Sequence, residues 1–368
     1  MDKIETTSND SLPVRIGNRY LTKNLSHIKP IEISGHILTK EEKEKLKKLK
    51  RKTYFLSALT GAVFVLLVIL PFHFSDFFKA QQISIMGYRL DFEVYNSVYA
   101  IIMVFPEIWI LNVLNMRAVK QICEIYQYPP PEHDDYKEQI QLLTEAGLEI
   151  SDKHMLTLGI NPYVGLPKIS YWLLFLFTKL ESLLSNLVIK LIVRRILGRY
   201  ALRIFMDLVG VPVYAFWDAW ASHKVMKEAK IRLVSTAASK QFLRGFSTAE
   251  LESVRSKIPS LVNYIAQEKR AYNFALYAFM KEVSIKLPGI TLKMNEKVHL
   301  DRIFGNNDAE NYVLARLLIF GFIVDGTLSV KERLLLYKLG REEWFPLQLH
   351  DVERIMKEYV YGEGLESF

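Results

Sequence analysis

The stretch TYFLSALTGAVFVLLVILPFHF, Thr53–Phe74, decides the fold class of this chain. It contains no charged residue from Tyr54 to Phe72, and a helix rising about 1.5 Å per residue crosses the hydrocarbon of a bilayer over that length. The segment directly before it, residues 40–52, contains eight lysine and arginine residues. A basic segment followed by an uncharged apolar run is typical of a transmembrane helix that starts on the cytosolic side.

A second apolar run, Val94–Met116, follows after a short polar loop and is interrupted by Pro106 and Glu107. The loop, residues 75–93, holds only two cations, so the positive-inside rule places it outside the membrane and both chain ends in the cytosol. We therefore expect an integral membrane protein with a two-helix transmembrane hairpin, located in a bacterial inner membrane.

The apolar block 169–223 leaves two topologies open. Lys179, Glu181 and Lys190 lie within its first half, where charged side chains are costly at the centre of a membrane helix. If both halves crossed, their arginine-rich connector would also face outside. We expect helices on the membrane surface or re-entrant helices, and a third and fourth transmembrane helix are the alternative. Residues 198–233 resemble the end of EcsC-like membrane-associated proteins, which agrees with membrane association.

Two basic clusters lie beside these apolar segments. Because the membrane is the nearer polyanion, their position favours contact with the anionic headgroups of lipids. We therefore predict that the chain has no nucleic acid partner. The residues predicted to contact headgroups are Lys47, Lys48, Arg51, Lys52, Arg194, Arg195, Arg199 and Arg203.

From residue 224 onward, apolar residues recur at spacings of three and four, and no strand pattern stands out, so the chain is predicted to be all-α. The predicted organisation is a flexible cytosolic tail (1–38), a basic helix with the hairpin (39–116), cytosolic linker helices (117–168), the membrane block (169–223) and a helical cytosolic domain (224–368).

The stretch FIVDGTLSVKERLLL, residues 322–336, joins two helices of that last domain. Gly326 suits a left-handed helix end, and Ser329 with Glu332 forms a capping box for the next helix. A structural turn therefore accounts for the whole motif without any ligand.

The same motif, from about residue 260 onward, resembles the core helix pair of TerB-like (tellurite-resistance) domains. The resemblance implies that Asp325 and Glu332 hold a divalent cation. Two carboxylates supply too few oxygens for calcium, so we predict no cofactor and keep a divalent cation as the alternative. The resemblance also implies a stress-response or scaffolding role beside a membrane.

These observations predict a non-enzymatic, membrane-anchored interaction, sensing or scaffolding module in envelope stress or defence. They also predict an unidentified protein partner and self-association into an oligomer. One alternative is an oligomeric channel or transporter with Glu107 in its membrane path. Another is a membrane-bound, metal-dependent hydrolase that uses EHDD, residues 132–135, or WDAWASH, residues 217–223.

Overall fold

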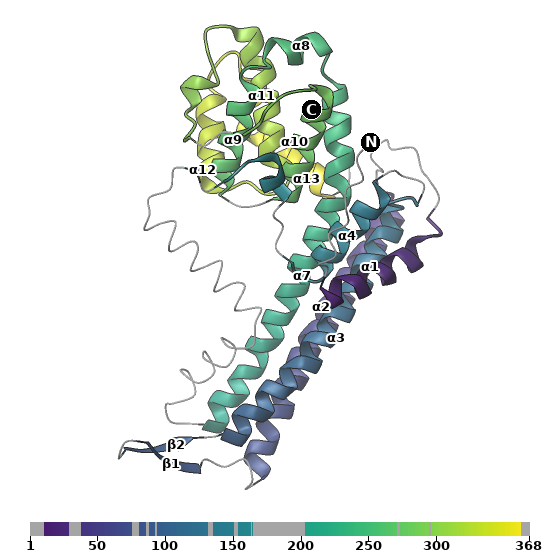
Figure 1. Cartoon of the computed structure of the whole chain (residues 1–368), viewed down its shortest axis with the longest axis vertical. Helices are drawn as coiled ribbons and strands as arrows, with labels where there is room; N and C mark the ends of the chain where they lie inside the picture. The colour runs from purple at the N-terminus through teal and green to yellow at the C-terminus, as the bar shows by residue number, and fades with distance from the viewer. Residues whose placement is uncertain are drawn as a thin grey trace. The chain divides into compact units, whose positions relative to one another are not determined.

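The computed structural model describes residues 11–28, 38–75, 81–85, 88–92, 94–131, 135–150, 154–162, 164, 203–270, 273–293 and 296–361. Within these ranges the fold is helical apart from one two-stranded hairpin (Figure 1). The chain divides into two compact units, each of which is described by itself. Unit 1 takes residues 1–44, 122–167 and 228–368, and unit 2 takes residues 45–121 and 168–227.

Helix α2, Lys40–Phe74, contains both the basic segment and the first apolar run, as expected. It begins at a capping box: the Thr39 N–H donates to Glu42 Oε2 over 2.8 Å, and the Glu42 N–H donates to Thr39 Oγ1 over 3.3 Å. These two bonds satisfy backbone groups that the first helical turn leaves without partners.

Helix α3, Val94–Tyr126, is longer than the second apolar run. It continues past Met116 through residues that we expected to form a separate cytosolic linker helix. The sequence between Met116 and Tyr126 contains no glycine or proline, so nothing in it interrupts the backbone hydrogen bonds. The next helix, α4, spans Tyr136–Gly147.

A short β-hairpin joins α2 to α3 in this otherwise helical fold. Strand β1, Gln81–Ile85, pairs antiparallel with β2, Tyr88–Phe92, in a register that places Ile83 opposite Leu90. The apolar residues alternate with polar ones, which suits a strand. Each strand has only five residues, so this period is too short to stand out in the sequence.

The N-terminal segment, expected as a flexible tail over residues 1–38, contains helix α1, Leu12–Leu25. Its buried residues include Val14, Leu21 and Leu25, and the helix packs against α4. These three residues share one helical face, but many polar residues separate them, so the apolar period is hard to recognise in the sequence.

Helix α7, Arg203–Arg244, runs through the domain boundary that we expected at residue 223. No glycine or proline lies near that position, and Pro212 is accommodated inside the helix. Residues 203–227 of α7 belong to unit 2 and residues 228–244 to unit 1. The first part of the apolar block, residues 169–202, lies outside the described residues.

The rest of unit 1 is a set of short helices around an apolar core. Phe320 stacks on Phe242 with ring centroids 4.1 Å apart and meets the edge of Phe279 at 5.0 Å. Phe320 lies on a helix whose residues are buried on nearly all sides, so the other helices enclose it. The elements are η2 (His154–Leu158), α8 (Thr248–Ser253), α9 (Ile258–Lys269), α10 (Phe274–Lys286), η3 (Leu300–Arg302), α11 (Asp308–Ile323), α12 (Val330–Leu339) and α13 (Leu349–Tyr361).

Candidate functional site

The Asp-Gly turn between α11 and α12 has the local geometry that the sequence predicts. Gly326 adopts φ +67°, the left-handed conformation. The Ser329 N–H donates to Glu332 Oε2 over 2.6 Å, and the Glu332 N–H donates to Ser329 Oγ over 3.3 Å, so the capping box of α12 is complete. The left-handed glycine and the capping box that the sequence predicts are therefore both present.

Asp325 receives four hydrogen-bond or ion-pair contacts. Its Oδ1 accepts from the N–H and the hydroxyl of Thr327, both over 2.9 Å. Its Oδ2 accepts from Nδ2 of Asn273 over 2.7 Å. Asn273 is also the N-cap of α10, where its Oδ1 accepts from the Ala275 N–H over 2.9 Å. Asp325 therefore ties the turn after α11 to the start of α10.

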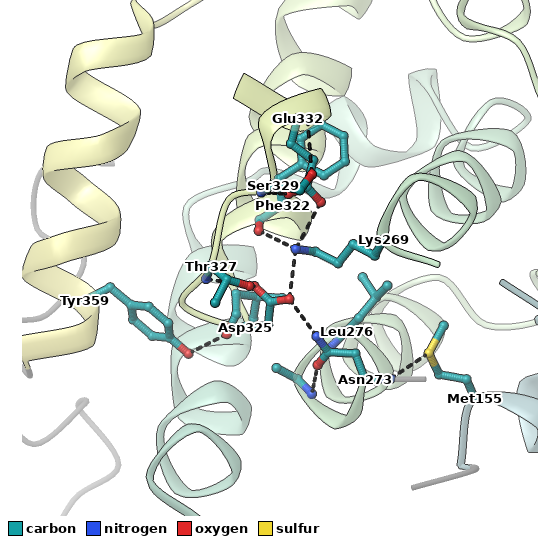
Figure 2. Close-up of polar contacts among 12 residues, drawn as sticks. Met155, Lys269, Asn273, Leu276, Phe322, Asp325, Thr327, Ser329, Glu332 and Tyr359 are labelled. Carbon is teal, nitrogen blue, oxygen red and sulfur yellow. Dashed lines mark hydrogen bonds and ion pairs between the residues drawn. The ribbon is translucent and has the colours of Figure 1, made fainter. Parts of the chain in front are cut away.

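Lys269, the last residue of α9, lies between the two predicted acidic residues (Figure 2). Its Nζ is 2.9 Å from Asp325 Oδ2 and 3.2 Å from Glu332 Oε1, and it donates to the carbonyl oxygen of Phe322 over 2.8 Å. The side chains of Lys269, Asp325 and Glu332 are 4%, 13% and 2% exposed. The Phe322 carbonyl thus accepts a hydrogen bond from the ammonium, and the two carboxylate oxygens lie within ion-pair distance of it.

The ammonium also completes the end of α11. Carbonyl groups in the last turn of a helix have no partner within the helix. Here the Phe322 carbonyl accepts from Lys269, and the Val324 carbonyl accepts from the Tyr359 hydroxyl of α13 over 2.9 Å. Burial, and then the negative charge of Asp325, raise the pKa of Tyr359, so its hydroxyl keeps the proton that it donates.

The sequence analysis missed Lys269 and Asn273. Lys269 lies in a run of charged residues at a helix end, where lysines are normally exposed, and no local pattern distinguishes it. Asn273 does carry a signal, because an asparagine directly before an apolar helical run is a favoured N-cap.

The predicted pair, Asp325 and Glu332, is therefore brought to one point, but an ammonium occupies the space between the carboxylates. Among the described residues, three oxygens are found within 3.2 Å of this ammonium, fewer than the six to eight that calcium takes. Across the described residues, no group of three or more His, Cys, Asp or Glu side chains is placed to hold a metal ion.

A second polar cluster lies in unit 2, where α2, α3 and α7 run side by side (Figure 1). The Ser57 and Ser222 hydroxyls are 2.7 Å apart, and Ser222 Oγ donates to Asn115 Oδ1 over 2.8 Å. Tyr54 Oη and His223 Nδ1 are 2.8 Å apart. One residue from each helix therefore meets in a buried hydrogen-bonded chain, as in helix packing within membranes.

Glu107 and Asp218 are both buried in unit 2. A Cβ built on Gly61 would lie 2.5 Å from Asp218 Oδ2 and 3.0 Å from the carbonyl oxygen of Tyr214. Helices α2 and α7 are therefore in close contact at Gly61, where a side chain would not fit.

The outer faces of α2 and α3 have the opposite character. Along their apolar runs these helices expose large apolar side chains at helical spacing, while Ser57, Glu107 and Asn115 are buried, the reverse of a helix in water. The exposed set comprises Phe55, Leu59, Val63, Leu67, Leu70 and Phe74 on α2, and Val98, Ile102, Phe105 and Trp109 on α3. Both helices are long and apolar enough to cross a membrane.

The remaining predicted residues are placed only in part. The headgroup candidates Lys47, Lys48, Arg51 and Lys52 are exposed on α2, and Arg203 begins α7. Arg194, Arg195 and Arg199 lie outside the described residues, as do residues 132–134 of EHDD.

Asp218 and His223 of WDAWASH meet different residues of α2. Asp218 lies against Gly61, whereas His223 contacts Tyr54. Trp217 and Trp220 are exposed, and Trp220 stacks on His223 with ring centroids 5.6 Å apart.

Comparison with known proteins adds no assignment. No protein-family model, curated protein or solved structure matches this chain, and the TerB-like and EcsC-like resemblances stay predictions.

Proposed function

We propose that this chain is a non-enzymatic, membrane-anchored interaction module. Unit 2 inserts into the bacterial inner membrane, and unit 1 is the cytosolic part that contacts a partner. The observation that carries the proposal is the inverted polarity of α2 and α3, with apolar side chains outside and Ser57, Glu107 and Asn115 buried. Contact of such a surface with lipid tails is favourable, whereas its exposure to water is unfavourable.

We assign the N-terminal half of α7 to the membrane anchor as well, because it too has polar side chains inside unit 2 and apolar ones outside. It bonds to α2 and α3 through Ser222 and presents Val213, Phe216, Trp217 and Trp220 outward. This supports the membrane-inserted alternatives for the second part of the block 169–223 over a helix that only lies on the surface. Tryptophan is enriched where a membrane helix meets the headgroups.

The interaction role draws support from α12. Leu336 on its inner side is buried in the core of unit 1. Val330, Leu334 and Tyr337 are exposed and, at spacings of four and three residues, lie on one face of the helix. A helix with apolar residues on both sides presents a surface that a partner protein can cover.

Membrane extraction tests the anchor. After alkaline carbonate treatment of membranes that contain the full chain, we expect the protein in the pellet and its release by detergent alone. Recovery as a monomer from detergent-free buffer contradicts the proposal.

Photocrosslinking in cells tests the interaction surface. We expect a photoreactive residue at Leu334 to give a discrete adduct, and the same residue at the exposed Lys357 of α13 to give none. Equal adduct yields at both positions, or no adduct at Leu334, contradict a partner on α12.

An ion or proton path is the second candidate, because Glu107 and Asp218 are buried within unit 2. It predicts ion flux through the full chain in liposomes and its loss in Glu107→Gln. Liposomes without flux above the protein-free level exclude it.

A further inference from the structure

We propose that Lys269 is the permanent cation of the Asp-Gly turn, so that unit 1 assembles without a divalent metal ion and is not switched by one. The inference goes beyond the membrane anchor, since it concerns how the cytosolic module is held together. It assigns a role to a residue that lies outside the Asp-Gly motif.

The acceptors around Nζ fit an ammonium in number and distance. Asp325 Oδ2, Glu332 Oε1 and the Phe322 carbonyl lie 2.9, 3.2 and 2.8 Å away. One of these oxygens accepts a hydrogen bond from Nζ, and the other two are carboxylate oxygens at ion-pair distance from its positive charge. A calcium ion requires about six to eight oxygens at shorter distances of roughly 2.3–2.6 Å.

The other carboxylate oxygens are already committed elsewhere. Asp325 Oδ1 accepts two bonds from Thr327, and Glu332 Oε2 accepts the backbone N–H of Ser329. A metal ion that recruited these oxygens would break the cap of α12 and the turn after α11. The existing hydrogen bonds therefore leave one cation position, which Lys269 fills (Figure 2).

Charge compensation points to the same conclusion, most clearly at Glu332. Among the described residues, no hydrogen-bond donor reaches Glu332 Oε1, so the nearby ammonium is what compensates its buried charge. Asp325 has neutral donors from Asn273 and Thr327 in addition to Lys269. Without its ammonium, Glu332 would be a buried anion with one bonded oxygen, which is strongly unfavourable.

A tethered cation has a consequence for regulation. A bound metal dissociates when its concentration falls, whereas a lysine side chain stays attached to α9 at every cation concentration. The junction of α9, α10, α11 and α12 is therefore constitutive, and any signal that unit 1 transmits arises elsewhere than at this turn.

Metal dependence of the full chain in detergent is the first test. We expect the melting temperature to be the same in excess EDTA as in excess calcium or magnesium, and elemental analysis to find no stoichiometric divalent metal. A lower melting temperature in EDTA that calcium or magnesium restores overturns the proposal, and so does stoichiometric bound metal.

A double-mutant cycle identifies the counter-ion of Glu332. We expect Lys269→Met to lower the melting temperature strongly in the wild-type background and clearly less in a Glu332→Gln background, because Gln keeps the capping box but needs no cation. Equal losses in both backgrounds overturn the assignment. If Lys269→Met does not fold alone, folding of the double variant supports the coupling, and if neither folds, the metal test decides.

The half-exposed ion pair of Lys257 and Glu310, with Nζ and Oε2 2.7 Å apart, is the matched control in the same unit. Lys257→Met and Glu310→Gln should each cause a small shift, and their effects should add, since an accessible pair contributes little. A coupling in the control pair as large as that of Lys269 and Glu332 overturns the proposal.

Discussion

Gly326 is the residue at which the backbone conformation itself selects the amino acid. With φ +67° it lies in the left-handed region, and a Cβ at this position would be 2.7 Å from Val360 Cγ2. Both the turn geometry and the packing of α13 against it therefore require glycine.

Gly326→Ala should destabilise unit 1 by about 1–2 kcal/mol from the left-handed backbone, with a further loss from the clash with Val360. Thermal unfolding of the detergent-solubilised chain measures this. Gly305→Ala is the control, because its Cβ would meet only Lys257 Nζ, the flexible end of a side chain, at 3.5 Å. Equal effects of the two substitutions would show that the turn imposes no special constraint.

Tyr359 gives a pH-dependent prediction. Burial and the charge of Asp325 raise its pKa in the folded protein above the value of about 10 in the unfolded chain. The folded state therefore holds this proton more tightly, so the stabilisation is fully present below about pH 10 and is lost as the pH rises through the folded pKa.

Tyr359→Phe should lose about 1–3 kcal/mol at neutral pH, because the Val324 carbonyl is left buried without its donor. Above pH 10, the stability of the variant should fall less steeply with pH than that of the wild type. Unfolding measured from neutral to alkaline pH checks both effects, with the exposed Tyr337→Phe as control. An unchanged alkaline slope in Tyr359→Phe would contradict the argument.

At the scale of elements, the contact of α2 with α7 depends on Gly61. Gly61→Ala places a methyl group 2.5 Å from Asp218 Oδ2, so the two helices must move apart or the carboxylate must turn. Inserting a group into a packed contact costs about 1–3 kcal/mol.

We therefore expect Gly61→Ala to lower the melting temperature of the detergent-solubilised chain. Gly210→Ala on α7 is the matched control, because its Cβ would meet nothing within 4 Å. If Gly210→Ala lowers the melting temperature as much as Gly61→Ala does, close packing of α2 and α7 is not the cause.

Helix starts depend on residues close together in the chain. The capping boxes Thr39–Glu42, Ser247–Glu250 and Ser329–Glu332 all form, and each joins residues three apart in the chain. Glu332 nevertheless has a second role that its cap does not reveal. The box alone suggests that Glu332→Gln is nearly neutral, whereas its ion pair with Lys269 makes a clear loss the expected result.

At the scale of the whole molecule, the proposed anchor makes a topological prediction. In a Cys123→Ala background, a cysteine at Ser84 in the hairpin should react with a membrane-impermeant maleimide in intact cells. A cysteine at Lys357 should react only after the cells are permeabilised, because the positive-inside rule places unit 1 in the cytosol. If, in intact cells, the cysteine at position 357 is labelled and the cysteine at position 84 is not, the orientation is the opposite one.

The sequence by itself determined the helical class, the two membrane-length helices, and the turn at which α11 ends and α12 begins. These features depend on runs of apolar residues and on caps, whose interacting groups lie within a few residues of each other. It misjudged α1 and the continuity of α3 and α7. The apolar residues of α1 are too widely separated to stand out as a helical period. The sequences of α3 and α7 carry no local signal at the positions where we expected a domain boundary.

Only the tertiary structure decided that Asp325 and Glu332 face a lysine from α9, and that Ser57, Asn115 and Ser222 meet inside unit 2. These partners come from helices far apart in the chain, and packing of the apolar faces brings them together. The burial of a charge and the identity of its counter-ion are properties of that packing, which local sequence patterns do not contain.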